Sequence, residues 1–187
     1  IISDCKDAKM LDDKGEHLLK KSQFQNAKDQ FMKAQEKKNH CAYVYYQQSK
    51  YLLNQLKIEE ALNSLENSIK MNPSISEVQR EYGILLSSDN QIDNARFHLE
   101  KSLDLNYGDS IAHFNLGVIM VKMKDYDDAE QHFLSSLDIH PNLVECIIEL
   151  ALLKLIVDKK KEAKEYYEKA KLISPDLKHT ELEKFIG

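Results

Sequence analysis

The chain has 187 residues, of which 42% are hydrophobic and 30% are charged, and its formal net charge at pH 7 is −5. An acidic chain without a stripe of lysine, arginine and aromatic residues is unlike a protein that binds phosphate backbones, so no nucleic acid partner is predicted. No apolar run reaches the ~18 residues of a membrane helix, and therefore no membrane insertion is predicted.

One pattern of residues recurs along the chain at a constant interval of 34 residues. In each interval an alanine is followed by a large apolar residue four positions later and by a small residue three positions after that. The five alanines are Ala27, Ala61, Ala95, Ala129 and Ala163. All prolines share one position of the interval, and three of the five glycines share another. Scarce residues in one register indicate a repeat architecture, in which each unit packs on its neighbours.

Each repeat is predicted to form a hairpin of two helices. In the fourth repeat, apolar residues return every three or four positions from Ile111 to Val121 and again from Ala129 to Leu137, which is the spacing of amphipathic helices. Pro141 then ends the unit, because it cannot donate a helical hydrogen bond. The five hairpins are expected at about 8–41, 42–75, 76–109, 110–143 and 144–177. They would form a single array over residues 1–187.

Small residues in this register are predicted to let the two helices of a hairpin approach each other closely. The large residue from the partner helix would then fill the neighbouring groove. Gly117 is accordingly expected to be a packing position, at which a larger side chain overpacks the helix crossing.

The period and the order of these residues resemble the tetratricopeptide repeat, whose signature is W-x2-L-G-x2-Y, then A-x3-F, then P, over 34 residues. The fourth repeat matches best, through Leu116-Gly117, Ala129, Phe133 and Pro141, and the first departs most, with Asn39 where proline would stand. The resemblance implies an all-α fold, a right-handed superhelical solenoid of five helix-turn-helix hairpins. It also implies that residues 178–187 form a C-terminal capping helix; the alternative is that this helix folds into the groove of the array.

The sequence shows no arrangement of residues that indicates catalysis. It has no H-E-x-x-H, no G-x-S-x-G and no glycine-rich phosphate loop, and His98 and His132 are expected to be partly exposed repeat positions rather than ligands. The prediction is a protein that is not an enzyme, with no cofactor and no metal.

Three cysteines, Cys5, Cys41 and Cys146, occur without a C-x-x-C spacing. An odd number of cysteines in a fold that needs no disulfides favours a reducing, cytoplasmic location. The chain does not begin with methionine and is expected to be a fragment. A lipid on Cys5, as in a bacterial envelope protein, is an alternative that the preceding Asp4 disfavours.

The resemblance implies that the first helix of each hairpin lines a concave groove that binds partners. The predicted binding residues are Tyr43, Tyr46, Lys50, Arg80, Ile84, Ile111, Phe114, Val118, Val121, Ile148, Leu152 and Leu155. This surface is charged in the first repeat and apolar in the last, where residues 144–157 are apolar nearly all round, and such a helix is covered in its working state. We expect a scaffold or adaptor for protein–protein interaction that holds an apolar or amphipathic peptide or helix.

Several other functions are compatible with the pattern. A clamp for the acidic tails of heat-shock chaperones is disfavoured, because Asp12 and Glu16 stand at the matching positions of the first repeat. The alternatives are a homo-oligomeric assembly module and the repeat region of a larger enzyme. Segments such as REYGILLSS also loosely resemble bacterial repeat lipoproteins that assist type IV pilus assembly.

Overall fold

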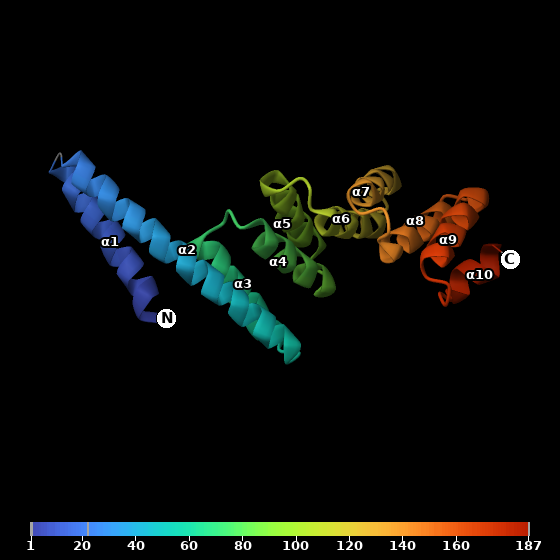
Figure 1. Cartoon of the computed structure of the whole chain (residues 1–187), viewed down its shortest axis with the longest axis horizontal. Helices are drawn as coiled ribbons and strands as arrows, with labels where there is room; N and C mark the ends of the chain where they lie inside the picture. The colour runs from blue at the N-terminus through green and yellow to red at the C-terminus, as the bar shows by residue number, and fades with distance from the viewer. Residues whose placement is uncertain (1, 22, 187) are drawn as a thin grey trace. The chain divides into compact units, whose positions relative to one another are not determined.

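The computed structural model describes residues 2–21 and 23–186, and this part of the chain is built from α-helices without a strand. The helices are α1 (Ile2–Lys20), α2 (Phe24–Asn54), α3 (Ile58–Met71), α4 (Ser76–Ser88), α5 (Ile92–Leu105), α6 (Ser110–Met123), α7 (Tyr126–Ile139), α8 (Val144–Ile156), α9 (Lys160–Ile173) and α10 (Thr180–Ile186) (Figure 1). They form two compact units, Ile1–Leu85 and Leu86–Gly187. The prediction of an all-α fold is confirmed.

In the first unit, α2 is a single helix of 31 residues. Figure 1 shows α1 beside its N-terminal half and α3 beside its C-terminal half. It therefore serves as the second helix of one hairpin and the first helix of the next. The helix end expected after Asn39 is absent, because no proline or glycine occurs within the helix to interrupt it, whereas Pro141 and Gly108 follow helices that do end.

The cysteines differ from the sequence prediction. Cys5 in α1 and Cys41 in α2 form a disulfide, with Cα atoms 6.0 Å apart, and Cys146 is a buried free thiol. A reducing compartment was inferred from the odd number of cysteines and from a fold that needs no disulfides, and this pairing was not predicted. Cys5 and Cys41 are 36 positions apart in the sequence. The packing of α1 against α2 brings them together, and their spacing in the sequence does not show this. Because disulfides persist mainly in oxidising compartments, the reason for a cytoplasmic location disappears, and the compartment stays a prediction.

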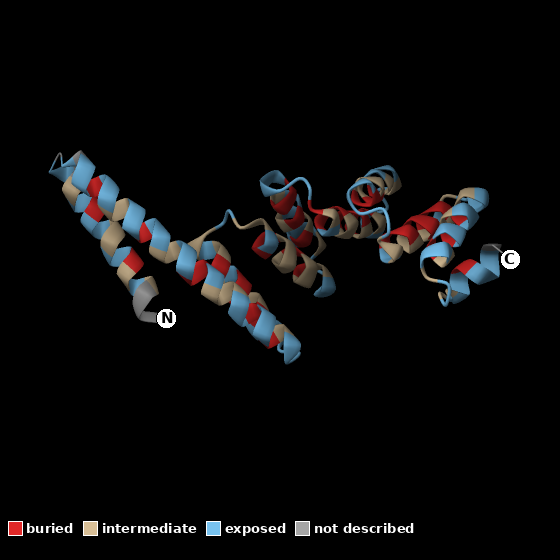
Figure 2. Cartoon of the chain, viewed as in Figure 1, coloured by how far each residue is buried: buried red, intermediate tan, exposed pale blue. Residues whose placement is uncertain are grey.

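In the second unit, α6 packs on α7 and α8 packs on α9, while α5–α6 and α7–α8 contacts join successive hairpins. Leu116, Phe133, Ile147 and Leu150 have no exposed surface and form much of the core; Figure 2 shows such buried positions along α6, α7 and α8. At the start of α6, the Asp109 carboxylate accepts hydrogen bonds from the backbone N–H groups of the first turn, both at 3.1 Å. Asp109 is therefore the N-cap of α6, and it satisfies backbone N–H groups that have no partner within the helix.

The hairpin turns repeat in their backbone geometry. Leu56, Asn90, Lys124 and Asp158 have φ between 58° and 65°, the left-handed region, and they stand one repeat apart. The sequence pattern did not reveal this position, because the four residues share no chemical type.

Two of the small residues in the second helices, Ser68 and Ser136, form hydrogen bonds to the first helix of their hairpin. The Ser68 hydroxyl donates to the Ala42 carbonyl at 2.7 Å, and the Ser136 hydroxyl donates to the Ser110 carbonyl at 2.8 Å. The first bond joins the C-terminal part of α3 to the middle of α2, and the second joins the C-terminal part of α7 to the start of α6.

The C-terminal helix α10 covers the end of the last hairpin. It contacts both α8 and α9, and its Leu182 is fully buried in a cluster with Ala151 and Tyr167. The Tyr167 hydroxyl also lies 2.9 Å from a Glu183 carboxylate oxygen, to which it donates. These contacts are those of a cap.

Candidate functional site

The predicted binding residues of the first unit lie on α2 and α4. Tyr43 is 58% exposed, and the Lys50 ammonium lies 4.8 Å from the centre of the half-buried Tyr46 ring, a cation–π contact. The Arg80 guanidinium donates to a Glu81 carboxylate oxygen at 3.1 Å, so part of its charge is already balanced. Ile84 is half-buried. This part of the set offers mainly polar and aromatic side chains, among them two tyrosines and a lysine.

The predicted residues of the second unit lie on α6 and α8. On α6, Ile111 is 45% exposed, while Phe114, Val118 and Val121 are half-buried. The Phe114 ring lies 6.1 Å from the ring of Phe133 in α7, measured between centroids. These side chains therefore each present part of their surface to solvent and part to the core.

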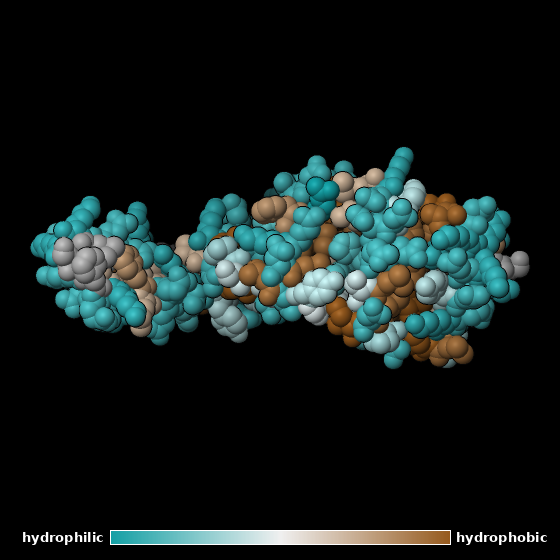
Figure 3. All heavy atoms as spheres, turned by 90° about the horizontal axis from the view of Figure 1, so that it is seen from above, coloured by the Kyte–Doolittle hydropathy of each residue, from teal (hydrophilic) through white to brown (hydrophobic). Residues whose placement is uncertain are grey.

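On α8, Ile148, Leu152 and Leu155 are half-buried and pack against the cluster of Ala151, Tyr167 and Leu182. Figure 3 shows hydrophobic atoms gathered on the face in view of the second unit, whereas the same view of the first unit is mostly hydrophilic. Apart from Ile84 on α4, the apolar members of the predicted set thus lie on α6 and α8, two helices of one unit that are in contact.

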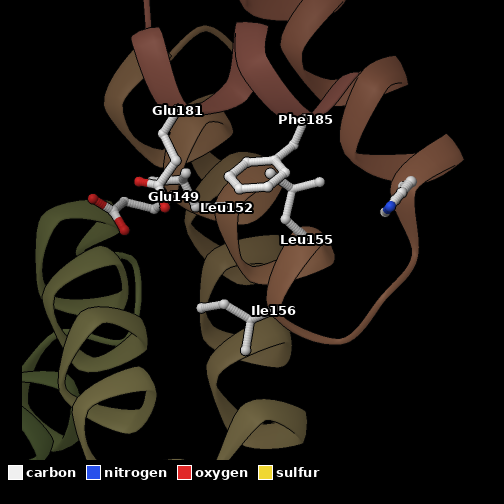
Figure 4. A pocket seen from close by; sticks show the side chains of 7 residues that line it. Glu149, Leu152, Leu155, Ile156, Glu181 and Phe185 are labelled. Carbon is white, nitrogen blue, oxygen red and sulfur yellow. The ribbon is translucent and has the colours of Figure 1, made fainter. Parts of the chain in front are cut away.

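A pocket of about 460 Å³ opens between α8, the start of α9 and α10. Its apolar lining consists of Leu152, Leu155, Ile156 and Phe185, and its charged lining of Glu149, Glu181 and Lys160 (Figure 4). In Figure 4 the Glu181 side chain points from α10 toward Glu149. Leu152 and Leu155 were predicted from the repeat register, whereas Glu149, Glu181 and Phe185 were not assigned to the site. The i and i+4 spacing of Glu181 and Phe185 on one helix was the signal that could have found them.

The electrostatics of the pocket centre on Glu149. Burial raises the pKa of this half-buried carboxyl, because a low-dielectric environment disfavours its charged form, and the nearby His179 opposes the shift. Among the described residues, none forms a hydrogen bond or an ion pair with the carboxylates of Glu149 or Glu181.

Two other groups of polar side chains in the second unit were not predicted. The buried Lys154 ammonium donates to Glu130 at 2.6 Å and pairs with Glu162 at 2.8 Å, which joins α8 to α7 and α9. The Nδ1 atoms of His113 and His132 lie 3.1 Å apart, so one ring donates and the other accepts. Both groups are internally satisfied. They hold helices together and offer no free group to a ligand.

No group of three metal-ligating side chains occurs among the described residues. The buried Cys146 thiol is a poor nucleophile, since burial raises its pKa to about 11. None of the helices in the described ranges is long and apolar enough to span a membrane.

Comparison with known proteins identifies the repeat. A family model described as tetratricopeptide repeat matches residues 83–143, and a second model with that description matches residues 144–177. Together the two matches span just over half of the chain. None of the curated protein sequences matches the chain.

Several solved structures share the fold. MamA is 17% identical, with 92% of this chain and 97% of that chain covered and a TM-score of 0.66. YrrB, described as a TPR protein with an unusual peptide-binding site, is 20% identical, with 89% and 86% covered and a TM-score of 0.65. The pilF protein of Pseudomonas aeruginosa is 19% identical, with 95% and 80% covered and a TM-score of 0.66. At these identities the likeness shows the fold alone.

Proposed function

Because the chain belongs to the tetratricopeptide repeat family, we propose that it is a protein-interaction scaffold that binds an apolar or amphipathic segment of another protein on α6 and α8. The observation that carries the proposal is the row of half-buried apolar side chains on these two helices, which includes Phe114, Val118, Ile148 and Leu152. A solvent-facing row of this kind is typical of an interaction surface.

The strength of such binding can be estimated from the apolar area that a partner would cover. If a partner covers on the order of 400 Å² of apolar surface, the transfer free energy is ~10 kcal/mol at about 25 cal/mol per Å². Loss of rigid-body and side-chain freedom opposes association by roughly 4–15 kcal/mol. At the low end of this cost the net binding free energy is about −6 kcal/mol, a dissociation constant of tens of micromolar, which suits a reversible adaptor. YrrB, a protein of the same fold, is described as having a peptide-binding site, which supports a peptide as the occupant.

The test uses a displayed library of random 12-residue peptides as the probe. Peptides selected on the wild-type chain are measured by fluorescence anisotropy against an Ile111→Asp/Phe114→Ser variant, with Leu172→Asp as the matched control, because Leu172 is 84% exposed on α9. We expect at least a tenfold loss of affinity in the first variant and a change below twofold in the control. Circular dichroism checks that both variants remain folded.

Selected peptides that bind the double variant as tightly as the wild type would overturn the proposed surface. Light scattering tests the competing use of the same face. A wild-type mass that rises with concentration, together with a variant that stays monomeric, would assign α6 and α8 to self-association instead.

A further inference from the structure

The pocket between α8 and α10 combines an apolar wall with two carboxylates, neither of which forms an ion pair or a hydrogen bond with another described residue. We propose that it selects the bound segment by charge, taking a lysine or arginine side chain between Glu149 and Glu181 while neighbouring apolar side chains lie on Leu152, Leu155 and Phe185. The partner is then a cationic amphipathic segment of a protein. This inference rests on the proposed function and specifies the chemistry of its partner.

The first argument is the state of Glu149. The side chain is half-buried at the pocket, and burial raises its pKa. Within the described residues neither Glu149 nor Glu181 is held in an ion pair or a hydrogen bond. A cation from the partner would therefore add an ion pair to both carboxylates. At half-buried Glu149 this pair would form where water screens charge less than at an open surface.

The second argument is the order of residues on the two helices. On α8, Glu149 precedes Leu152 by three residues, and on α10, Glu181 precedes Phe185 by four. In both helices a carboxylate thus lies one turn before an apolar side chain on the same face. Ile156 and Phe185 are 52% and 49% exposed, so the apolar wall is open to a ligand. A segment with a basic residue one helical turn from a leucine-like residue matches this arrangement.

The third argument concerns Lys160, which also lines the pocket. Glu149 is separated from the end of α8 at Ile156 by about 10 Å, at 1.5 Å per residue, and Lys160 begins the helix that follows. The pocket is therefore acidic near the middle of α8 and basic beyond its end. A second cation at that end would be repelled, and this gives the bound segment one preferred direction.

The experiment repeats the library selection on two charge-matched variants. Glu149→Gln/Glu181→Gln removes the two pocket carboxylates, and Glu165→Gln/Glu168→Gln removes two exposed carboxylates of α9. We expect wild-type selections to be enriched in lysine and arginine one turn from an apolar residue. For a selected peptide, the pocket variant should lose at least fivefold in affinity, and the α9 variant less than twofold.

A double-mutant cycle with the same peptide measures the contact directly. Replacing the peptide lysine by norleucine should weaken binding to the wild type at least fivefold and leave binding to the pocket variant unchanged. Selections without basic enrichment, or a cycle without coupling, would overturn the inference. If such peptides remain sensitive to Ile111→Asp/Phe114→Ser, the proposed function stands and only the charge selection fails. If the selected peptides bind the Ile111→Asp/Phe114→Ser variant as tightly as the wild type, both the proposed function and the charge selection are wrong.

Discussion

The ring of Phe133 lies directly against the backbone of Gly117. A Cβ atom added to Gly117 would come within 2.5 Å of Phe133 Cε1, closer than non-bonded carbon atoms approach. The same pair recurs three repeats earlier, where a Cβ on Gly15 would lie 2.7 Å from the Phe31 ring. Helix crossings in two hairpins therefore depend on the missing side chain.

Gly117→Ala should consequently destabilise the second unit. Alanine favours the helix by up to about 1 kcal/mol over glycine, but displacing the fully buried Phe133 ring costs roughly 1–3 kcal/mol. We expect a net loss of stability in urea unfolding followed by circular dichroism. Gly108→Ala is the control, because its Cβ would meet only Asn106 Oδ1, at 3.5 Å. Equal stability of both variants would show that the crossing can relax.

The packing within the hairpins could be predicted from the sequence. Close contact between two helices restricts the size of the residues at the crossing, and Gly117, Ala129 and Phe133 show this restriction in the repeat pattern. The same reasoning failed at α2. Its N-terminal half keeps the register of the first repeat, yet nothing in the sequence of the helix interrupts it, and local helix propensity continues the helix through Asn39.

Features that depend on distant contacts could not be predicted in this way. The Cys5–Cys41 pairing requires knowing how far α1 runs along α2. The charged part of the pocket requires the position of α10, which places Glu181 opposite Glu149. The repeat register placed Leu152 and Leu155 on one face of the first helix of the last hairpin, but it contains no information about a helix outside the repeats.

The turn at Leu56 stores avoidable backbone strain. Leu56 has φ of 60° and is 84% exposed, so a branched side chain occupies the left-handed region without a compensating contact from burial. The equivalent residue of the next turn is Asn90, a type that tolerates this conformation.

Leu56→Asn should therefore raise the unfolding free energy of the first unit by about 1 kcal/mol, a part of the roughly 1–2 kcal/mol that the left-handed conformation costs most residues. The reverse change, Asn90→Leu, should lower stability by a similar amount. Thermal melts of both variants test the pair of predictions, and a Leu56→Asn protein that melts below the wild type would contradict them.

The disulfide should contribute strongly to the stability of the first unit. Closing a loop with a separation of 36 residues is worth about 4 kcal/mol in the chain-entropy description. Cys5→Ser/Cys41→Ser, or reduction with dithiothreitol, should accordingly lower the urea midpoint of signals from Tyr43 and Tyr51, which report on α2.

A thiol titration provides the control for this prediction. The native oxidised chain should release no colour with Ellman's reagent, because Cys5 and Cys41 are paired and Cys146 is buried with a pKa of about 11. One thiol should react after unfolding without reductant. Three reactive thiols under those conditions would show that the disulfide had not formed.

The contact between His113 and His132 should make the second unit sensitive to mild acid. Burial lowers the pKa of both imidazoles, and for His132 the positive charge of a protonated His113 adds to the effect; Asp109 and Asp128 oppose it at His113 and His132, respectively. The folded state thus binds fewer protons than the unfolded chain. Stability is complete above the unfolded pKa of about 6.5 and declines as the pH falls below it.

Protonation of both rings also removes the contact itself, since two Nδ1–H groups would face each other across 3.1 Å. Urea unfolding between pH 7.5 and 5.0 should therefore show a steeper loss of stability in the wild type than in His132→Gln, which keeps a hydrogen-bonding side chain but cannot gain a proton. His140→Gln, at an exposed position after α7, should retain the wild-type slope. A wild-type slope that persists in His132→Gln would locate the pH sensitivity elsewhere, and His98, whose pKa burial also lowers, would be the next histidine of this unit to test.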